Sequence, residues 1–71
     1  MDIKALRYFL QVAETLSFNR ASERLNISQP VVTRVIAQLE HEIGTRLFDR
    51  TTRRVSLTPA GTVLLNEVRP L

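Results

Sequence analysis

Hydrophobic residues recur every three to four positions in the first part of the chain, which is the period of one face of an amphipathic helix. The pattern predicts a helix over about residues 2–16. Its inward stripe consists of Ile3, Leu6, Phe9, Leu10, Ala13 and Leu16. Ser17 is a residue type that caps helix N-termini, so a second helix is expected to follow it. The inward face of that helix consists of Phe18, Ala21, Ser22 and Leu25.

A tight turn is expected at Asn26, because asparagine tolerates the left-handed backbone conformation that ends a helix. Ser28, two residues later, is a suitable N-cap for a third helix, and Gly44 is placed to end that helix. The third helix points Val32, Val35, Ile36, Leu39 and Ile43 inward, and Pro30, Arg34, Ala37 and His41 outward. The two helices and their turn predict a tight helix-turn-helix.

The remaining sequence predicts a hairpin and a final helix. Residues 47–50 and 55–57 have the pattern of two short strands, joined by a polar tip at residues 51–54. Thr58 followed by Pro59 is an N-cap with a first-turn proline, which opens the last helix. The apolar residues of this helix exceed the needs of a small core: Ala60, Val63, Leu64, Leu65 and Val68. The predicted fold is mainly α, a winged helix-turn-helix with a three-helix core, a two-stranded hairpin wing and a C-terminal helix.

Composition restricts the possible functions. The 71 residues suffice for one small domain, and 44% hydrophobic with 24% charged residues is typical of a folded chain. The sequence has no cysteine, a single histidine (His41) and no glycine-rich phosphate loop, so we expect no enzyme, cofactor or metal site. No apolar run is long enough to span a bilayer and the N-terminus lacks a signal-peptide pattern. We therefore expect a cytoplasmic protein without a membrane partner.

The charge balance indicates a nucleic-acid partner. Ten Lys and Arg against seven Asp and Glu give a net charge of +3, and nine of the ten cations are arginine. The arginine fork matches phosphate oxygens and guanine edges better than lysine does. A merely basic surface is the alternative that charge alone leaves open.

The start of the third helix carries side chains suited to a DNA groove. Gln29 and Arg34 are the candidate base contacts, with Pro30 and Val31 offering apolar surface to thymine methyl groups. The candidate phosphate contacts of this helix are Ser28, Thr33 and Gln38. An ordinary solvated helix face is the alternative for this segment.

Four arginines lie within nine residues on or beside the hairpin: Arg46, Arg50, Arg53 and Arg54. At the wing they could contact phosphates or enter the adjacent minor groove, and the alternative is a solvated charge run. We assign Arg50 a structural role, because Glu40, Glu42 and Asp49 are near enough in sequence to pair with it. The candidate DNA contacts of the wing are Thr51, Arg53 and Arg54.

Three segments of the chain resemble the N-terminal domain of LysR-type transcriptional regulators. They are residues 17–34 (SFNRASERLNISQPVVTR), 39–50 (LEHEIGTRLFDR) and 57–61 (LTPAG), in the family's order and spacing. The resemblance implies a DNA-binding domain at residues 1–58, with its helix-turn-helix at about 18–37 and its wing at about 46–57. It also implies the start of a dimerisation linker helix at 59–71.

The resemblance also implies partners. Subunits would pair through the linker helix, whose candidate interface residues are Ala60, Leu64, Leu65 and Val68. A tetramer is expected for the full-length protein, acting at the bacterial nucleoid. A C-terminal domain absent from these residues would bind a small-molecule effector.

The sequence therefore predicts specific binding of double-stranded operator DNA, with a recognition helix at about residues 28–43 in the major groove. Two alternatives stay open. A winged helix used only for protein contact would show an apolar or acidic outward face on the third helix, which Gln29, Thr33 and Arg34 argue against. An RNA-binding winged helix is the other.

Overall fold

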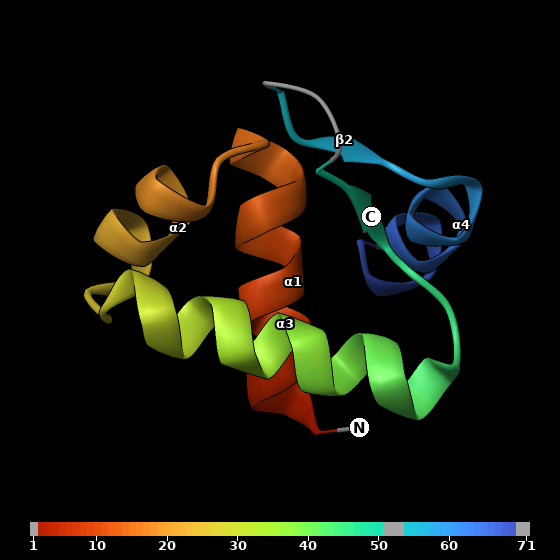
Figure 1. Cartoon of the computed structure of the whole chain (residues 1–71), viewed down its shortest axis with the longest axis horizontal. Coiled ribbons are helices and arrows are strands. Elements are labelled where there is room, and N and C mark those ends of the chain that lie inside the picture. The colour runs from red at the N-terminus through yellow and green to blue at the C-terminus, as the bar shows by residue number, and fades with distance from the viewer. Residues whose placement is uncertain (1, 51–53, 70–71) are drawn as a thin grey trace.

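A computed structural model of the chain describes residues 2–50 and 54–69. Within these residues, three helices form the core: α1 (Ile3–Thr15), α2 (Phe18–Leu25) and α3 (Gln29–Ile43). Figure 1 shows α3 crossing in front of α1, with α2 beside α1 near one end of α3. The predicted order of helices and their approximate bounds are confirmed.

Local capping signals set the ends of these helices. The Ser17 hydroxyl oxygen accepts a hydrogen bond from the Arg20 amide (3.1 Å) at the start of α2. Asn26 has a φ of 59° after α2, and Gly44 has a φ of 90° after α3. Both residues therefore adopt the left-handed conformation that the sequence predicts for a helix end.

Ser28 holds the N-cap position of α3, as predicted, but its side chain does not cap the helix. Its carbonyl oxygen instead accepts hydrogen bonds from the Val31 and Val32 amides, each at 3.2 Å. Pro30 stands at the second helical position and has no amide hydrogen to donate to a capping side chain. The exposed Ser28 hydroxyl thus takes no part in capping the N-terminus of α3.

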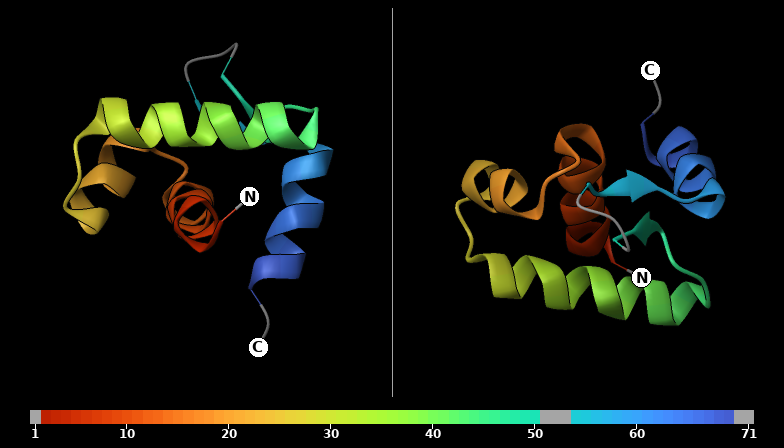
Figure 2. Two further views of the ribbon diagram at one scale, coloured as in Figure 1. Left: turned by 90° about the horizontal axis from the view of Figure 1, so that it is seen from below. Right: turned by 45° about the horizontal axis from the view of Figure 1, so that its top comes forward.

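The hairpin consists of β1 (Phe48–Asp49) and β2 (Ser56–Leu57), which pair antiparallel with Phe48 opposite Leu57. Both strands are shorter than the predicted 47–50 and 55–57. The last helix, α4 (Pro59–Val68), begins where the Thr58 hydroxyl oxygen accepts from an amide of the first turn. Figure 2 shows α4 and α2 on opposite sides of α1. In the described part of the chain, these four helices and two strands agree with the predicted, mainly helical class.

Phe48 of β1 lies at the centre of the core. Its ring centroid is 5.4 Å from that of Phe9 and 5.8 Å from that of Phe18, which it meets edge-on. The other fully buried large side chains are Ile36, Leu39, Leu47, Val12 and Val32. The hairpin is therefore held to α1 and α2 mainly by an aromatic residue at its base.

The predicted inward stripe of α1 is partly wrong. Ile3 is 76% exposed and Leu16 is also exposed, because Ile3 lies in the first turn and Leu16 follows the helix in a left-handed conformation. The face that packs into the core is turned from the predicted one and consists of Ala5, Tyr8, Phe9, Val12 and Ala13.

Candidate nucleic-acid interface

The outward face of α3 is polar and free of acidic side chains over most of its length. Gln29, Arg34 and Gln38 are exposed, as are Pro30 and the later residues Ala37 and His41. Between positions 29 and 41 the only acidic residue is Glu40, and it is buried. This face can therefore approach a negatively charged backbone without repulsion from its first three turns.

Two predicted contacts are less accessible than the others. Val31 and Thr33 are half-buried, and Val31 packs against the core. Only part of the Val31 side chain is left for contact with a base.

An open groove of about 520 Å³ separates the start of α2 from α3 and the hairpin. It is lined by Leu16, Ser17, Phe18, Asn19, Gln29, Arg54 and Val55. The fold thus brings Gln29 of α3 and Arg54 of the wing to one groove, although they are far apart in sequence. Arg34 and Gln38 lie in another shallow hollow of α3, beside Ala37, His41 and the acidic Glu42 near the end of the helix.

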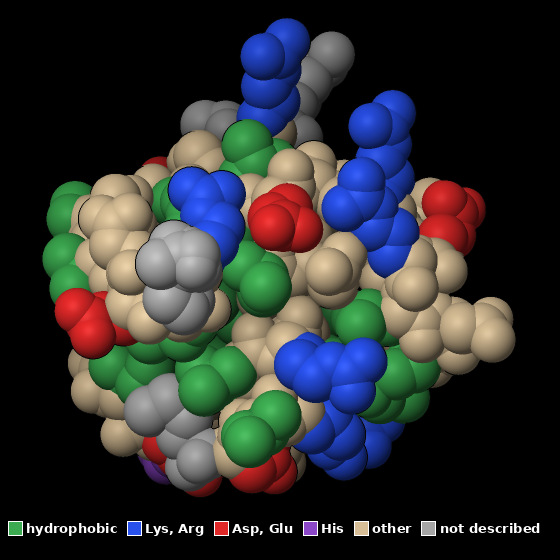
Figure 3. All heavy atoms as spheres, turned by 180° about the vertical axis from the view of Figure 1, so that it is seen from behind, with side chains coloured by type: hydrophobic (Ala, Val, Ile, Leu, Met, Phe, Trp, Pro, Cys, Tyr) green, Lys and Arg blue, Asp and Glu red, His purple; other side chains and the backbone are tan. Residues whose placement is uncertain are grey.

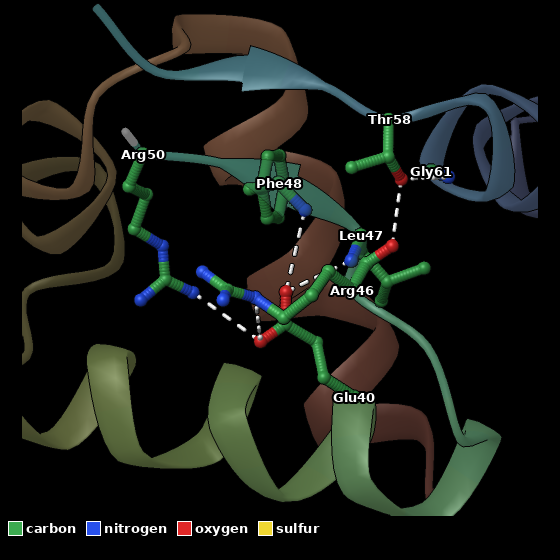
Figure 4. Close-up of polar contacts among 7 residues, drawn as sticks. All are labelled: Glu40, Arg46, Leu47, Phe48, Arg50, Thr58 and Gly61. Atoms are coloured by element: carbon green, nitrogen blue, oxygen red, sulfur yellow. Dashed lines mark hydrogen bonds and ion pairs between the residues drawn. The ribbon is translucent and has the colours of Figure 1, made fainter. Parts of the chain in front are cut away.

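The base of the wing is joined to α3 by the carboxylate of Glu40, which is only 7% exposed (Figure 4). Its Oε2 accepts hydrogen bonds from the amides of Leu47 (2.9 Å) and Phe48 (3.3 Å). Its Oε1 lies 3.4 Å from Arg50 Nη2 and 3.6 Å from Arg46 Nε. Two amides and two guanidinium groups therefore compensate this buried charge.

Arg50 has the structural role that the sequence predicts. Besides its ion pair with Glu40, its guanidinium lies over the Phe18 ring, 4.6 Å from the centroid. Sequence reasoning missed the backbone partners of Glu40. A signal was present, because Glu40 stands four positions after the inward-facing Ile36 and so falls on the buried side of the helix.

The start of α4 is fixed against the same part of the hairpin. The Thr58 amide donates to the Leu47 carbonyl (3.0 Å), and the Thr58 hydroxyl donates to the Arg46 carbonyl (2.7 Å) while accepting from the Gly61 amide (3.0 Å). Gly61 is required for this approach, because a Cβ there would collide with the Leu47 carbonyl oxygen. Close packing of α4 on the hairpin thus depends on a glycine.

The candidate interface residues of α4 differ in exposure. Leu65 is 9% exposed and belongs to the core of its own chain, so little of its side chain is left for contact with a second subunit. Ala60, Leu64 and Val68 are half-buried. Val63 is 63% exposed and is the most exposed apolar side chain of α4.

Of the predicted wing contacts, Arg54 is described and exposed, whereas Thr51 and Arg53 lie outside the described residues. Figure 3 shows the side turned away from α3, where Lys and Arg side chains stand apart among acidic and apolar ones. On that side, positive charge does not gather into one patch. The case for a nucleic-acid interface therefore rests on α3 and the wing rather than on overall charge.

Two other features, a metal site and a membrane-spanning helix, are not found among residues 2–50 and 54–69. These residues include no group of three or more His, Asp or Glu side chains placed to hold a metal ion. None of the helices described is long and apolar enough to cross a membrane.

Comparison with known proteins finds similarity along nearly the whole chain. Residues 3–62 match a family described as bacterial regulatory helix-turn-helix protein, lysR family. The regulator TfdT of Cupriavidus pinatubonensis is 51% identical over 71 residues, which is 100% of this chain and 31% of that protein. The regulator XapR of Escherichia coli is 54% identical over 70 residues, covering 99% of this chain and 24% of that protein.

Solved structures show the same fold. The crystal structure of the BenM DNA-binding domain in complex with catB site 1 DNA has a TM-score of 0.92 and 40% identity, covering 96% of this chain and 76% of that one. Against the curated relatives, by contrast, the present chain spans about a quarter to a third of their length.

Proposed function

The chain belongs to the lysR family of bacterial regulatory helix-turn-helix proteins, and we propose that it binds double-stranded operator DNA in a sequence-specific manner. One observation carries the proposal. The polar, outward face of α3 starts at the groove that it shares with the wing, where Gln29 and Arg54 lie together. A helix and a basic hairpin so placed can engage a major groove and the neighbouring backbone at the same time.

In this arrangement α3 enters the major groove with its N-terminal half. Gln29 and Arg34 reach base edges, since both are exposed and carry side chains that can form paired hydrogen bonds with adenine or guanine. Pro30 and the accessible part of Val31 contact thymine methyl groups. Ser28, with its hydroxyl outside the helix cap, binds phosphate.

The remaining contacts are to the backbone. Thr33 and Gln38 follow the same groove along α3, and Arg54 places a cation at the flanking phosphates or minor groove. Thr51 and Arg53 are proposed as further wing contacts on the sequence alone. The complex of the BenM domain with DNA supports this use of the fold.

For the whole protein we propose a transcription regulator of the bacterial cytoplasm. Two copies pair through α4, using Ala60, Leu64 and Val68 together with the exposed Val63, and two such dimers form the tetramer. From the family resemblance we also propose a C-terminal domain that binds a small-molecule effector.

Selection of bound sequences from a random duplex library tests the proposal. We expect one half-site to be enriched, and to occur twice as an interrupted palindrome when the chain binds as a dimer. Arg34→Ala should relax the preference at one position. Arg7→Ala removes the same charge from an exposed position on α1 and should leave the preferred sequence unchanged. Recovery of no preferred sequence by the wild-type chain would contradict the proposal.

The same assay separates the two alternatives. RNA of matched sequence should bind more weakly than the selected DNA duplex, and tighter binding to RNA would overturn the assignment of DNA as the ligand. A domain used only for protein contact would bind neither.

A further inference from the structure

One short segment of backbone, residues 46–48, holds three parts of the molecule together. The Leu47 amide donates to Glu40 of α3, and the Leu47 carbonyl accepts from Thr58 at the start of α4. The Phe48 amide also donates to Glu40, and the Arg46 carbonyl accepts from the Thr58 hydroxyl. These few bonds therefore join the hairpin and the start of α4 to α3 (Figure 4).

The hairpin cannot fix its own pose. Its strands are two residues long, and strand pairs of this size are marginal without packing against other elements. Two anchors hold its base: the Phe48 ring in the core and the Glu40 carboxylate. The ring packs the base of the hairpin on α1 and α2, whereas the carboxylate is a direct polar link from α3 to the backbone of β1.

We propose that Glu40 is a positioning residue for DNA binding, which orients the wing so that Arg54 reaches the backbone while α3 occupies the major groove. The inference rests on the proposed function, because it concerns how two parts of that interface act together. Glu40 itself is buried and does not contact DNA. Its effect on affinity passes through the hairpin.

The geometry explains why a carboxylate is needed. One oxygen serves the Leu47 and Phe48 amides while the other faces the two guanidinium groups. Glutamine has nearly the same size but only one acceptor oxygen, so its amide group would present hydrogens to one set of donors. One of the two links must then break.

Comparison of Glu40→Gln with Glu42→Gln tests the inference. Both variants remove one negative charge from α3, and Glu42 is exposed. Simple electrostatics predicts that each variant binds DNA as well as the wild type or more tightly, because a repulsive charge is lost. We expect Glu42→Gln to follow that rule and Glu40→Gln to bind the selected duplex about tenfold more weakly.

A double-variant cycle with Arg54→Ala separates positioning from general destabilisation. If Glu40 acts through the wing, Glu40→Gln should lower the slope of log affinity against log salt by about one and have little further effect once Arg54 is gone. Affinities are measured at a temperature where unfolding curves show every variant to be folded. Additive losses in the double variant would overturn the proposal, and so would equal behaviour of Glu40→Gln and Glu42→Gln.

Two further measurements cover the remaining outcomes. Amide hydrogen exchange in the free chain should show faster exchange at Leu47 and Phe48 in Glu40→Gln, with Ile36 unchanged. Unchanged exchange at Leu47 and Phe48 would refute the anchoring role.

Should the Gln variant fail to fold, Glu40→Asp keeps the charge but retracts the oxygens by about 1.5 Å. It should then also weaken binding, and wild-type affinity would refute the inference. If the wild-type chain binds no duplex, the proposed function fails, and the exchange data still decide whether Glu40 anchors the hairpin.

Discussion

Replacing Gly61 with alanine should destabilise the chain, although alanine is the better helix former. An added Cβ would collide with the Leu47 carbonyl oxygen and would lie 2.8 Å from Leu57 Cδ2 and 3.2 Å from the Leu47 carbonyl carbon. The Leu57 side chain can rotate away. The Leu47 carbonyl cannot retreat freely, because it accepts the Thr58 amide at 3.0 Å. Helix α4 must therefore shift away from the hairpin.

The size of the effect follows from three contributions. Forced overpacking costs about 1–3 kcal/mol, and a backbone obstacle belongs at the upper end of that range. Loss of the Thr58 hydrogen bond adds about 1 kcal/mol, and the gain in helix propensity returns a similar amount. The net loss is about 2–3 kcal/mol. For a chain of 71 residues this lowers Tm by roughly 10–20 °C.

Urea unfolding followed by circular dichroism measures this loss, and Gly44 supplies a matched control. Gly44 has a φ of 90° but open space around it, so Gly44→Ala should cost about 1–2 kcal/mol through backbone strain alone. Asparagine tolerates positive φ, so Gly44→Asn should recover part of that loss. Gly61→Asn should be no more stable than Gly61→Ala, because any Cβ at this position collides with the Leu47 carbonyl oxygen. A Gly61→Ala variant as stable as the wild type would refute the close approach of α4 to the hairpin.

Three further predictions concern the turn, the two kinds of DNA contact and α4. Asn26→Val should lower the free energy of unfolding by about 1–3 kcal/mol, because Asn26 has a φ of 59°; an unchanged urea midpoint would contradict this. In salt titrations, Arg34→Ala should lose about 1–3 kcal/mol of binding free energy on the selected duplex and much less on a scrambled one. Arg54→Ala should weaken binding to both duplexes and lower the slope of log affinity against log salt by about one. The opposite result for the two variants would make Arg54 the base contact and Arg34 the phosphate contact. Val63→Lys should reduce self-association in analytical ultracentrifugation at nearly unchanged Tm; undiminished association would exclude the exposed face of α4 as the interface.

The helix ends could be predicted because each carries a local signal. Ser17, Asn26, Gly44 and Thr58 act on backbone groups within a few residues, so their effect does not depend on the rest of the fold. Ser28 is the exception: the Val31 amide, which corresponds to the amides capped by Ser17 and Thr58, donates to the Ser28 carbonyl oxygen instead of to its hydroxyl.

Which face of α1 is buried depends on distant residues. Periodicity alone does not separate a stripe containing Ile3 and Leu16 from one containing Ala5 and Val12, because both recur at helical spacing. Phe9 belongs to both stripes, and its contact with Phe48 of the hairpin centres the buried face of α1 on Phe9.

For the candidate site, the sequence predicted residue types but not their grouping. Exposed polar positions on α3 follow from its period, and Arg50 was assigned correctly from nearby acidic residues. That Gln29 and Arg54 share a groove follows only from how the hairpin docks. Leu65 is buried in its own chain, and an apolar stripe does not tell whether its partner is the same chain or another.

Residues 46–48 form hydrogen bonds with both Glu40 of α3 and Thr58 at the start of α4. This arrangement affects how a dimer would bind two half-sites. If two copies pair through α4, one path between the two recognition helices runs through α3, the segment 46–48 and Thr58 in each copy, beside the packing of α4 on α1. The links on that path are the hydrogen bonds of Glu40 and Thr58 to this segment and the packing contact of Gly61. The distance between recognition helices is then a property of this junction and of α4. The sequence read within each half-site depends instead on the outward face of α3. We therefore expect substitutions at the junction to change the half-site spacing, and substitutions on the outward face of α3 to change the base preference.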